Sequence, residues 1–153
     1  MPATYGLDQI VLDRRSTGSA LARRIAQRWT GPAPEVVDDV EGFVETFAQR
    51  PEALTRGKRT LLVTPRKGPF LTLCQGMTER HSACCGYATL NVIENCPMDC
   101  TYCILLGYLS NPLVVAHSNL QSLRDEVESA RPGCGRLLRI GTGELGDSLA
   151  LDR

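Results

Sequence analysis

Three cysteines stand within one segment of eight residues, and they are the clearest indication of chemistry in this chain. They lie in the segment CPMDCTYC, residues 96–103, with three and then two residues between them. One tight loop with this spacing can direct three thiolates at one iron–sulfur cluster. A cluster of four irons with three protein ligands keeps one iron open, and a substrate can be activated at an open metal position. The pattern predicts a [4Fe–4S] site held by Cys96, Cys100 and Cys103.

Zinc is the alternative metal for these thiolates. Zinc sites usually have four protein ligands, which often come as two C-x2-C pairs. The sequence contains one such pair, Cys100 and Cys103. A non-catalytic protein that only binds zinc or an iron–sulfur cluster therefore stays open as the alternative function.

The residues before the cysteine segment are predicted to form a small α/β module over 1–67. Strand patterns occur at 10–12, 35–37 and 60–64, and helical patterns occur at 21–29 and 40–49. Ser16 or Thr17 can cap the first helix. This alternating order predicts a largely parallel sheet.

A second unit is predicted over residues 68–153, after the proline-rich boundary at 65–69. A strand at 87–93 leads into the cysteine loop, and a helix follows Ser118 or Asn119. A strand at 136–140 leads into a glycine-rich loop at 141–144. Functional loops of α/β barrels follow the carboxyl ends of strands, and a full barrel needs about 200 residues or more. We therefore expect the start of a barrel that is truncated in this chain.

The cysteine pattern, with Tyr102 before its last cysteine, resembles radical S-adenosylmethionine (SAM) enzymes. In these enzymes the open iron chelates SAM, and an electron from the cluster cleaves it to a 5′-deoxyadenosyl radical. The resemblance implies a [4Fe–4S] cluster, SAM, and an electron donor of the reduced flavodoxin or ferredoxin type. It places Tyr102 near the cluster or the adenine; an ordinary core aromatic is the alternative. The implied SAM-binding residues, for which a plain turn is the alternative, are Gly141, Thr142, Gly143 and Glu144.

Most of residues 58–153 resembles a narrower group, the spore photoproduct lyase-like or DNA repair photolyase-like radical SAM proteins. The segments that carry this resemblance are 58–62, 67–70, 84–87, 95–105, 108–112, 140–144 and 147–152. The family implies a partial (β/α)6 barrel, so the expected fold class is α/β, with a small module before the start of that barrel. Its founding activity reverses the thymine dimer of spore DNA, which makes DNA or another nucleic acid the expected substrate.

The sequence departs from the family where a hydrogen-donating cysteine is expected. In the true lyases this cysteine lies in the segment that matches 142–147, and here that segment reads TGELGD. Cys134 precedes the predicted strand and would lie at its opposite end. We therefore expect radical formation, but no dimer reversal by a cysteine of this segment.

The composition of the chain constrains its expected partners and cellular location. The charges of the 17 basic and 17 acidic residues cancel, so the chain has no net electrostatic field that would attract nucleic acid. A local basic stretch, 56–67, could contact phosphate or form a solvated strand edge. The sequence has no apolar run of about 18 residues and no signal-peptide pattern, so no membrane partner is expected. Seven cysteines without an export signal indicate a reducing, cytoplasmic location and metal chemistry. The four cysteines without an assigned role are Cys74, Cys84, Cys85 and Cys134.

Overall fold

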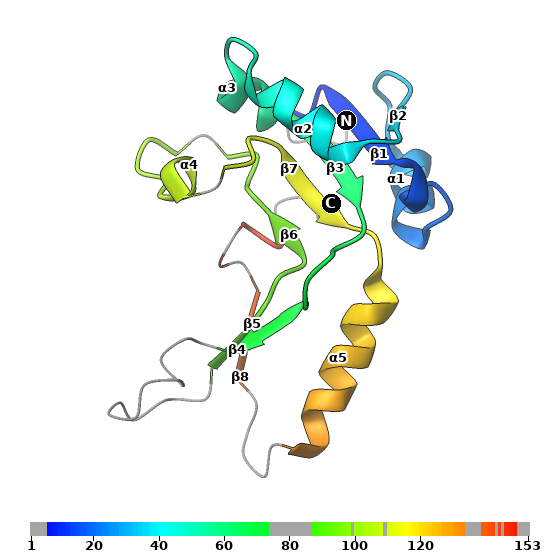
Figure 1. Cartoon of the computed structure of the whole chain (residues 1–153), viewed down its shortest axis with the longest axis vertical. Coiled ribbons are helices and arrows are strands. Elements are labelled where there is room, and N and C mark those ends of the chain that lie inside the picture. Colours follow the sequence, from blue (N-terminus) through cyan, green and yellow to red (C-terminus); the bar gives the residue numbers. More distant parts are fainter. Residues whose placement is uncertain are drawn as a thin grey trace.

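The structure is a computed structural model, and it describes residues 6–73, 87–98, 100–108, 110–133, 139–142, 144 and 146–149. Figure 1 shows two sheets joined by extended segments, with a long helix beside the second sheet. The elements are β1 (Gln9–Asp13), the 3-10 helix η1 (Arg14–Ser16), α1 (Ala20–Arg28), β2 (Glu35–Val37), α2 (Val40–Ala48), α3 (Ala53–Gly57), β3 (Thr60–Thr64), β4 (Leu71–Leu73), β5 (Tyr87–Leu90), β6 (Ile93–Glu94), α4 (Leu105–Tyr108), β7 (Val114–His117), α5 (Leu120–Gly133) and β8 (Arg139–Gly141).

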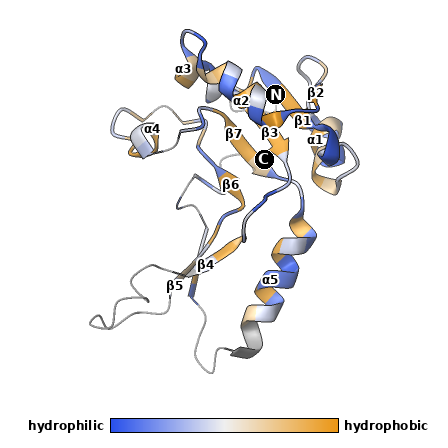
Figure 2. Cartoon of the chain, viewed as in Figure 1, coloured by the Kyte–Doolittle hydropathy of each residue, from blue (hydrophilic) through white to orange (hydrophobic). Residues whose placement is uncertain are grey.

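The first sheet has the strand order β2-β1-β3-β7-β6, in which β6 is antiparallel and the other strands are parallel. Its central strands are continuous apolar runs because helices cover both faces of the sheet. One face packs Ile10, Leu61 and Val114 against α1. The other face packs Leu62 and its neighbours against α2. Figure 2 shows the hydrophobic residues concentrated on these central strands, which form the core of the molecule.

The strands predicted at 10–12, 35–37 and 60–64 are confirmed as parallel neighbours, whereas the ends of the helices differ. Ser19 caps α1, since its side chain accepts a hydrogen bond from the amide of Ala22 at 3.0 Å. The expected caps are wrong: Ser16 belongs to η1, and its hydroxyl lies 2.7 Å from that of Ser118. The short helix α3 was not predicted, because five residues are too few to show a helical period.

The second sheet has the order β4-β5-β8, with β5 and β8 parallel. Helix α5 is tied to it by Glu126, whose carboxylate accepts hydrogen bonds from the amides of Phe70 and Leu71 at 2.8 and 2.9 Å. The parallel pair β5 and β8, connected through α5, is compatible with the first two strands of a barrel. The barrel itself stays a prediction.

The predicted strand at 87–93 is divided between the two sheets. Its first part is β5 in the second sheet, and its last residue begins β6 in the first sheet. Strand β6 pairs with β7, with Ile93 opposite Ala116 and Glu94 opposite Val115. The first sheet thus takes strands from both sides of residue 67. In the part of the chain described above, no helix has the length and apolar character that crossing a membrane requires.

Candidate functional site

The cysteine segment lies in the long connection between β6 and β7 (Figure 1). Cys96 is buried, whereas Cys100 and Cys103 are partly exposed, and all three are free thiols. The amide of Cys103 donates a hydrogen bond to the carbonyl of Cys100 at 3.1 Å, which closes a turn between these two residues. The segment therefore presents three thiols on one loop that contains a tight turn.

Asn95 fixes the entrance of this loop. Its backbone has a φ of 63°, in the left-handed region that asparagine tolerates better than most residues. Its buried side chain accepts a hydrogen bond from the amide of Cys96 at 2.9 Å and donates one to the carbonyl of Pro112 at 3.1 Å. Asn95 therefore turns the chain into the loop and links its beginning to its end. Asn95 belongs to the segment 95–105, which carries the family resemblance, but nothing in the local sequence indicates this role.

Lys58 holds the loop from the first sheet. Its side chain is only 5% exposed, and its ammonium group donates a hydrogen bond to the carbonyl of Met98. The preceding residue is packed equally closely, because a Cβ at Gly57 would lie 2.2 Å from the carbonyl oxygen of Pro112. The connection between α3 and β3 thus supports the cysteine loop. Lys58 belongs to the basic stretch 56–67 that the sequence indicated. Its side chain is buried and holds the loop, so its role in this structure is structural.

The segment after β8 reaches the same loop. Gly146 is buried, and a Cβ there would lie 2.4 Å from the carbonyl oxygen of Asn95. A Cβ at Gly141 would overlap the hydroxyl of Tyr87, so this tyrosine of β5 lies directly over that glycine. The structure therefore brings Gly146, two residues after the glycine-rich loop 141–144, against the entrance of the cysteine loop.

Thr142 and Glu144, two other expected SAM-binding residues, lie after β8. The Thr142 hydroxyl lies 2.8 Å from that of Ser148, and Glu144 is exposed. Gly143 lies outside the described residues, as do Cys74, Cys84, Cys85 and Cys134. Tyr102 is 89% exposed, so the alternative of a core aromatic is wrong. Its expected place near a cofactor stays a prediction.

The side chains available for a metal are the three thiols of this loop. In the described ranges, no group of three or more His, Cys, Asp or Glu side chains is arranged to hold a single metal ion. Cysteine thiolates are the usual ligands of iron–sulfur clusters. The chemistry of three thiols on one loop suits such a cluster, but the described part of the chain does not gather them into a metal site. Asn95 and Lys58 hold this loop.

A polar cluster adjoins the loop at the end of the first sheet. Glu94, which precedes Cys96 by two residues, accepts a hydrogen bond from Arg66 at 2.7 Å and lies 3.3 Å from Nε2 of His117. The hydrogen bonds with His117 and Arg66 hold the pKa of the Glu94 carboxyl below its ordinary value, although burial raises it. No local sequence pattern indicated this cluster, because its members come from three separate segments.

Comparisons with known proteins identify the fold. No family model and no curated protein matches the sequence. A solved structure of spore photoproduct lyase complexed with dinucleoside spore photoproduct matches 97% of this chain with a TM-score of 0.72 and 14% sequence identity. A doubly substituted variant of that lyase, with bound AdoMet and dinucleoside spore photoproduct, matches 95% with a TM-score of 0.70 and 16% identity.

The match extends over less than half of those lyases. This chain spans 43% of the first structure and 42% of the second. The resemblance inferred from the sequence is thus confirmed at the level of the fold: the chain is a mixed α/β structure similar to part of spore photoproduct lyase.

Proposed function

We propose that Cys96, Cys100 and Cys103 hold a [4Fe–4S] cluster and that the protein belongs to the radical SAM enzymes. What supports this is the set of three free thiols on one loop, within a fold similar to part of spore photoproduct lyase. When bound, the cluster supplies the electron that cleaves SAM to a 5′-deoxyadenosyl radical. Cys96 supplies a buried thiolate, and the partly exposed Cys100 and Cys103 leave one side of the loop accessible.

The segment after β8 is proposed to bind SAM. Glycines at 141 and 143 permit close approach of a backbone, and the exposed carboxylate of Glu144 can pair with the SAM ammonium. The contact between Gly146 and Asn95 supports this assignment, because it keeps this segment beside the cysteine loop. Tyr102 is proposed to cover the cluster or the adenine with its exposed ring.

The proposed partners are SAM, an electron donor of the flavodoxin or ferredoxin type, and a nucleic-acid substrate. Three of the similar lyase structures hold dinucleoside spore photoproduct, which supports a substrate of this class. The segment 142–147 offers no thiol. Reversal of the thymine dimer therefore requires a hydrogen donor from outside this segment, since hydroxyl and carboxyl groups have much stronger bonds to hydrogen than a thiol has.

Anaerobic reconstitution of the chain with iron and sulfide tests the cluster. The reconstituted protein should absorb at roughly 400 nm, as expected of a cysteine-ligated cluster. A variant with alanine at positions 96, 100 and 103 should lose the absorption and the bound iron, whereas Cys134→Ala should retain both. Iron and sulfide retained in the triple variant would contradict the assignment.

Incubation of the reconstituted chain with SAM and dithionite tests the reaction. We expect 5′-deoxyadenosine as a product. Glu144→Ala should weaken SAM binding about 10- to 150-fold, because it removes one charge-assisted hydrogen bond. An intact cluster without SAM binding would favour the non-catalytic alternative.

A further inference from the structure

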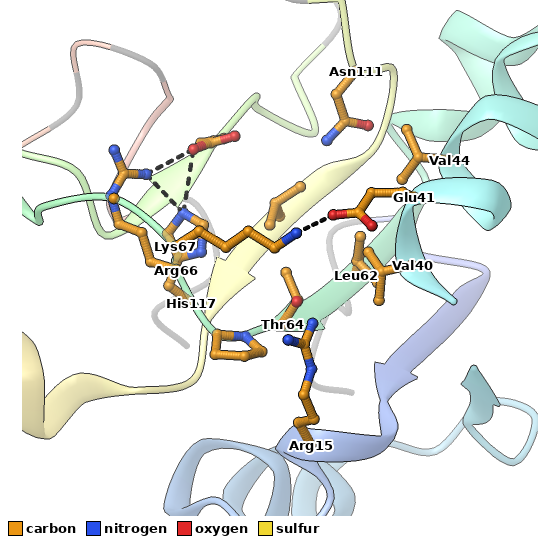
Figure 3. Close-up of a pocket in the computed structure, with 14 residues that line it drawn as sticks. Arg15, Val40, Glu41, Val44, Leu62, Thr64, Arg66, Lys67, Asn111 and His117 are labelled. Carbon is orange, nitrogen blue, oxygen red and sulfur yellow. Dashed lines mark hydrogen bonds and ion pairs between the residues drawn. The ribbon is translucent and has the colours of Figure 1, made fainter. Parts of the chain in front are cut away.

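A cavity of about 350 Å³ lies at the carboxyl ends of β1, β3 and β7 (Figure 3). Arg15 follows β1, Thr64 ends β3 and His117 ends β7. The strand order changes direction here, because the chain passes from β1 to β2 on one side and then to β3 on the other. Ligands of open α/β sheets bind in the crevice at such a switch point. The cavity thus has the position and the size, above about 300 Å³, of a small-molecule site.

The lining of the cavity combines apolar side chains with charged ones. Val40 and Val44 of α2 line it together with Leu62 and Val115 of the sheet. The lining also includes three cationic side chains and two carboxylates, which are Arg15, Arg66, Lys67, Glu41 and Glu94. Glu41 comes from α2 and lies beside Val40 and Val44 (Figure 3). A ligand that matches this mixed lining has an apolar body and an anionic group.

Arg15 is held in position at the edge of this cavity. The side chain of Asp13 is buried and accepts hydrogen bonds from Nε and Nη2 of Arg15 at 3.1 and 2.7 Å. The hydroxyl of Thr64 also donates a hydrogen bond to this carboxylate, at 2.8 Å. A guanidinium has five N–H donors, so Arg15 retains donors for an anion after binding Asp13. A buried carboxylate therefore fixes an arginine whose remaining donors stay available.

Lys67 extends across the cavity toward Glu41, with Arg15 nearby (Figure 3). The side chains of Lys67 and Glu41 are 69% and 72% exposed. Ion pairs this exposed contribute little to stability, so Lys67 can exchange Glu41 for a bound anion at small cost. Arg15 and Lys67 can then contact one anionic group from two sides.

His117 gives a second, independent indication of a ligand. It lines the cavity and is 5% exposed, and its Nδ1 has no hydrogen-bond partner among the described residues. Its other nitrogen faces Glu94 and Arg66. Buried polar atoms in proteins nearly always have a partner. A polar group of a ligand in the cavity would provide that partner.

We propose that this cavity binds a phosphate-bearing molecule of mononucleotide size. Arg15 and Lys67 contact the phosphate, the apolar wall formed by Val40, Val44 and Leu62 contacts the ring, and His117 bonds to a polar atom. The site is separate from the proposed SAM site and does not depend on a metal. It adjoins the connection that carries the cysteines through Glu94, which precedes Cys96 by two residues, and through Asn111.

Calorimetric titration of the 153-residue chain with adenosine 5′-monophosphate tests the proposal. The nucleotide should bind at least about 10-fold more tightly than adenosine or inorganic phosphate alone, because each of these contacts only part of the lining. Arg15→Gln and Lys67→Gln should each weaken nucleotide binding about 10- to 100-fold.

Arg59→Gln is the matched control. Arg59 is also half-exposed and ion-paired, with Asp8, but it precedes β3 at the opposite end of the strand. This variant should bind the nucleotide as the parent chain does. The variant with alanine at 96, 100 and 103 should also bind normally, which separates this proposal from the proposed cluster.

Three results would overturn the proposal. They are the absence of nucleotide binding, binding that Arg15→Gln and Lys67→Gln leave unchanged, and equal affinity for the nucleotide and inorganic phosphate. If circular dichroism shows that Arg15→Gln does not fold, Lys67→Gln decides, since its exposed side chain contributes little to folding.

Discussion

The first sheet and the cysteine loop are ordered by different means. In the sheet, side chains such as Phe47 and Leu62 are 1% exposed and pack between helices and strands. In the loop, Tyr102 and Ile104 are 89% and 81% exposed, and a few hydrogen bonds from Asn95 and Lys58 hold the backbone. The sheet is therefore stabilised by its own apolar contacts. The loop takes its shape from polar contacts of Asn95 at its entrance and of Lys58, which lies 40 residues before Met98 in the sequence.

Truncation of the core should have the largest effect. Phe47→Ala removes a buried ring that packs against Phe43, with a centroid distance of 6.0 Å. We expect the free energy of unfolding to fall by about 3–5 kcal/mol, as for other buried phenylalanines. Tyr102→Ala in the loop should change it by less than about 0.5 kcal/mol. Urea denaturation of both variants checks the comparison, and similar losses would contradict it.

Gly146→Ala should come next, because it disturbs the contact between the two loops. The new Cβ would lie 2.4 Å from a backbone oxygen of Asn95, which cannot move aside as a side chain can. Overpacking of this kind costs about 1–3 kcal/mol. Gly68→Ala is the control, since a Cβ there meets nothing within 4 Å. Equal thermal stability of the two variants would show that Gly146 has room.

Lys58→Met should loosen the loop and leave the sheet intact. The substitution keeps the length of the side chain but removes the donor to the carbonyl of Met98. A hydrogen bond from a charged group is worth about 1.5–3 kcal/mol, so hydrogen exchange at the Cys103 amide should accelerate at least about 10-fold. Amides of β3 should keep their rates, and Arg59→Met should leave both unchanged. Equal acceleration in β3 and in the loop would mean that Lys58 stabilises the whole fold and not the loop in particular.

The smallest effect is expected from Asp13→Asn, which changes how the free energy of unfolding depends on pH. Burial raises the pKa of its carboxyl, but the hydrogen bonds from Arg15 and Thr64 outweigh this and hold it below the ordinary value. A depressed folded-state pKa contributes stability above the unfolded-state value, near pH 4, and this contribution is lost as the pH falls through the folded-state pKa. Asp13→Asn should therefore lose less stability between about pH 6 and pH 3. Parallel urea midpoints for the two proteins across this range would rule out the contribution.

The regular elements of the first sheet could be predicted because their signals are local. Continuous apolar runs give β1 and β3 directly, and Phe43 and Phe47 at helical spacing give α2. The division of residues 87–93 between two sheets could not be predicted, since it depends on β6 pairing with β7, which lies beyond the cysteine loop.

The same distinction applies to the candidate site. The three cysteines could be identified because their spacing is local in the sequence. The contacts that hold their loop could not, because Lys58 and Met98 are 40 residues apart and Asn95 and Pro112 are 17 apart. The cavity joins residues of several strands and helices for the same reason. The SAM-binding role of the glycine-rich segment stays a prediction.

The pairing of β6 with β7 has a consequence for how the thiols meet a cluster. It closes the chain segment 95–113 at its base, and Asn95 reinforces the closure through Pro112. Closing a flexible segment of this length costs about 2–3 kcal/mol of chain entropy. Folding of the first sheet meets that cost before any cluster arrives. Assembly of the proposed cluster would then have to order only the short path from Cys96 to Cys103.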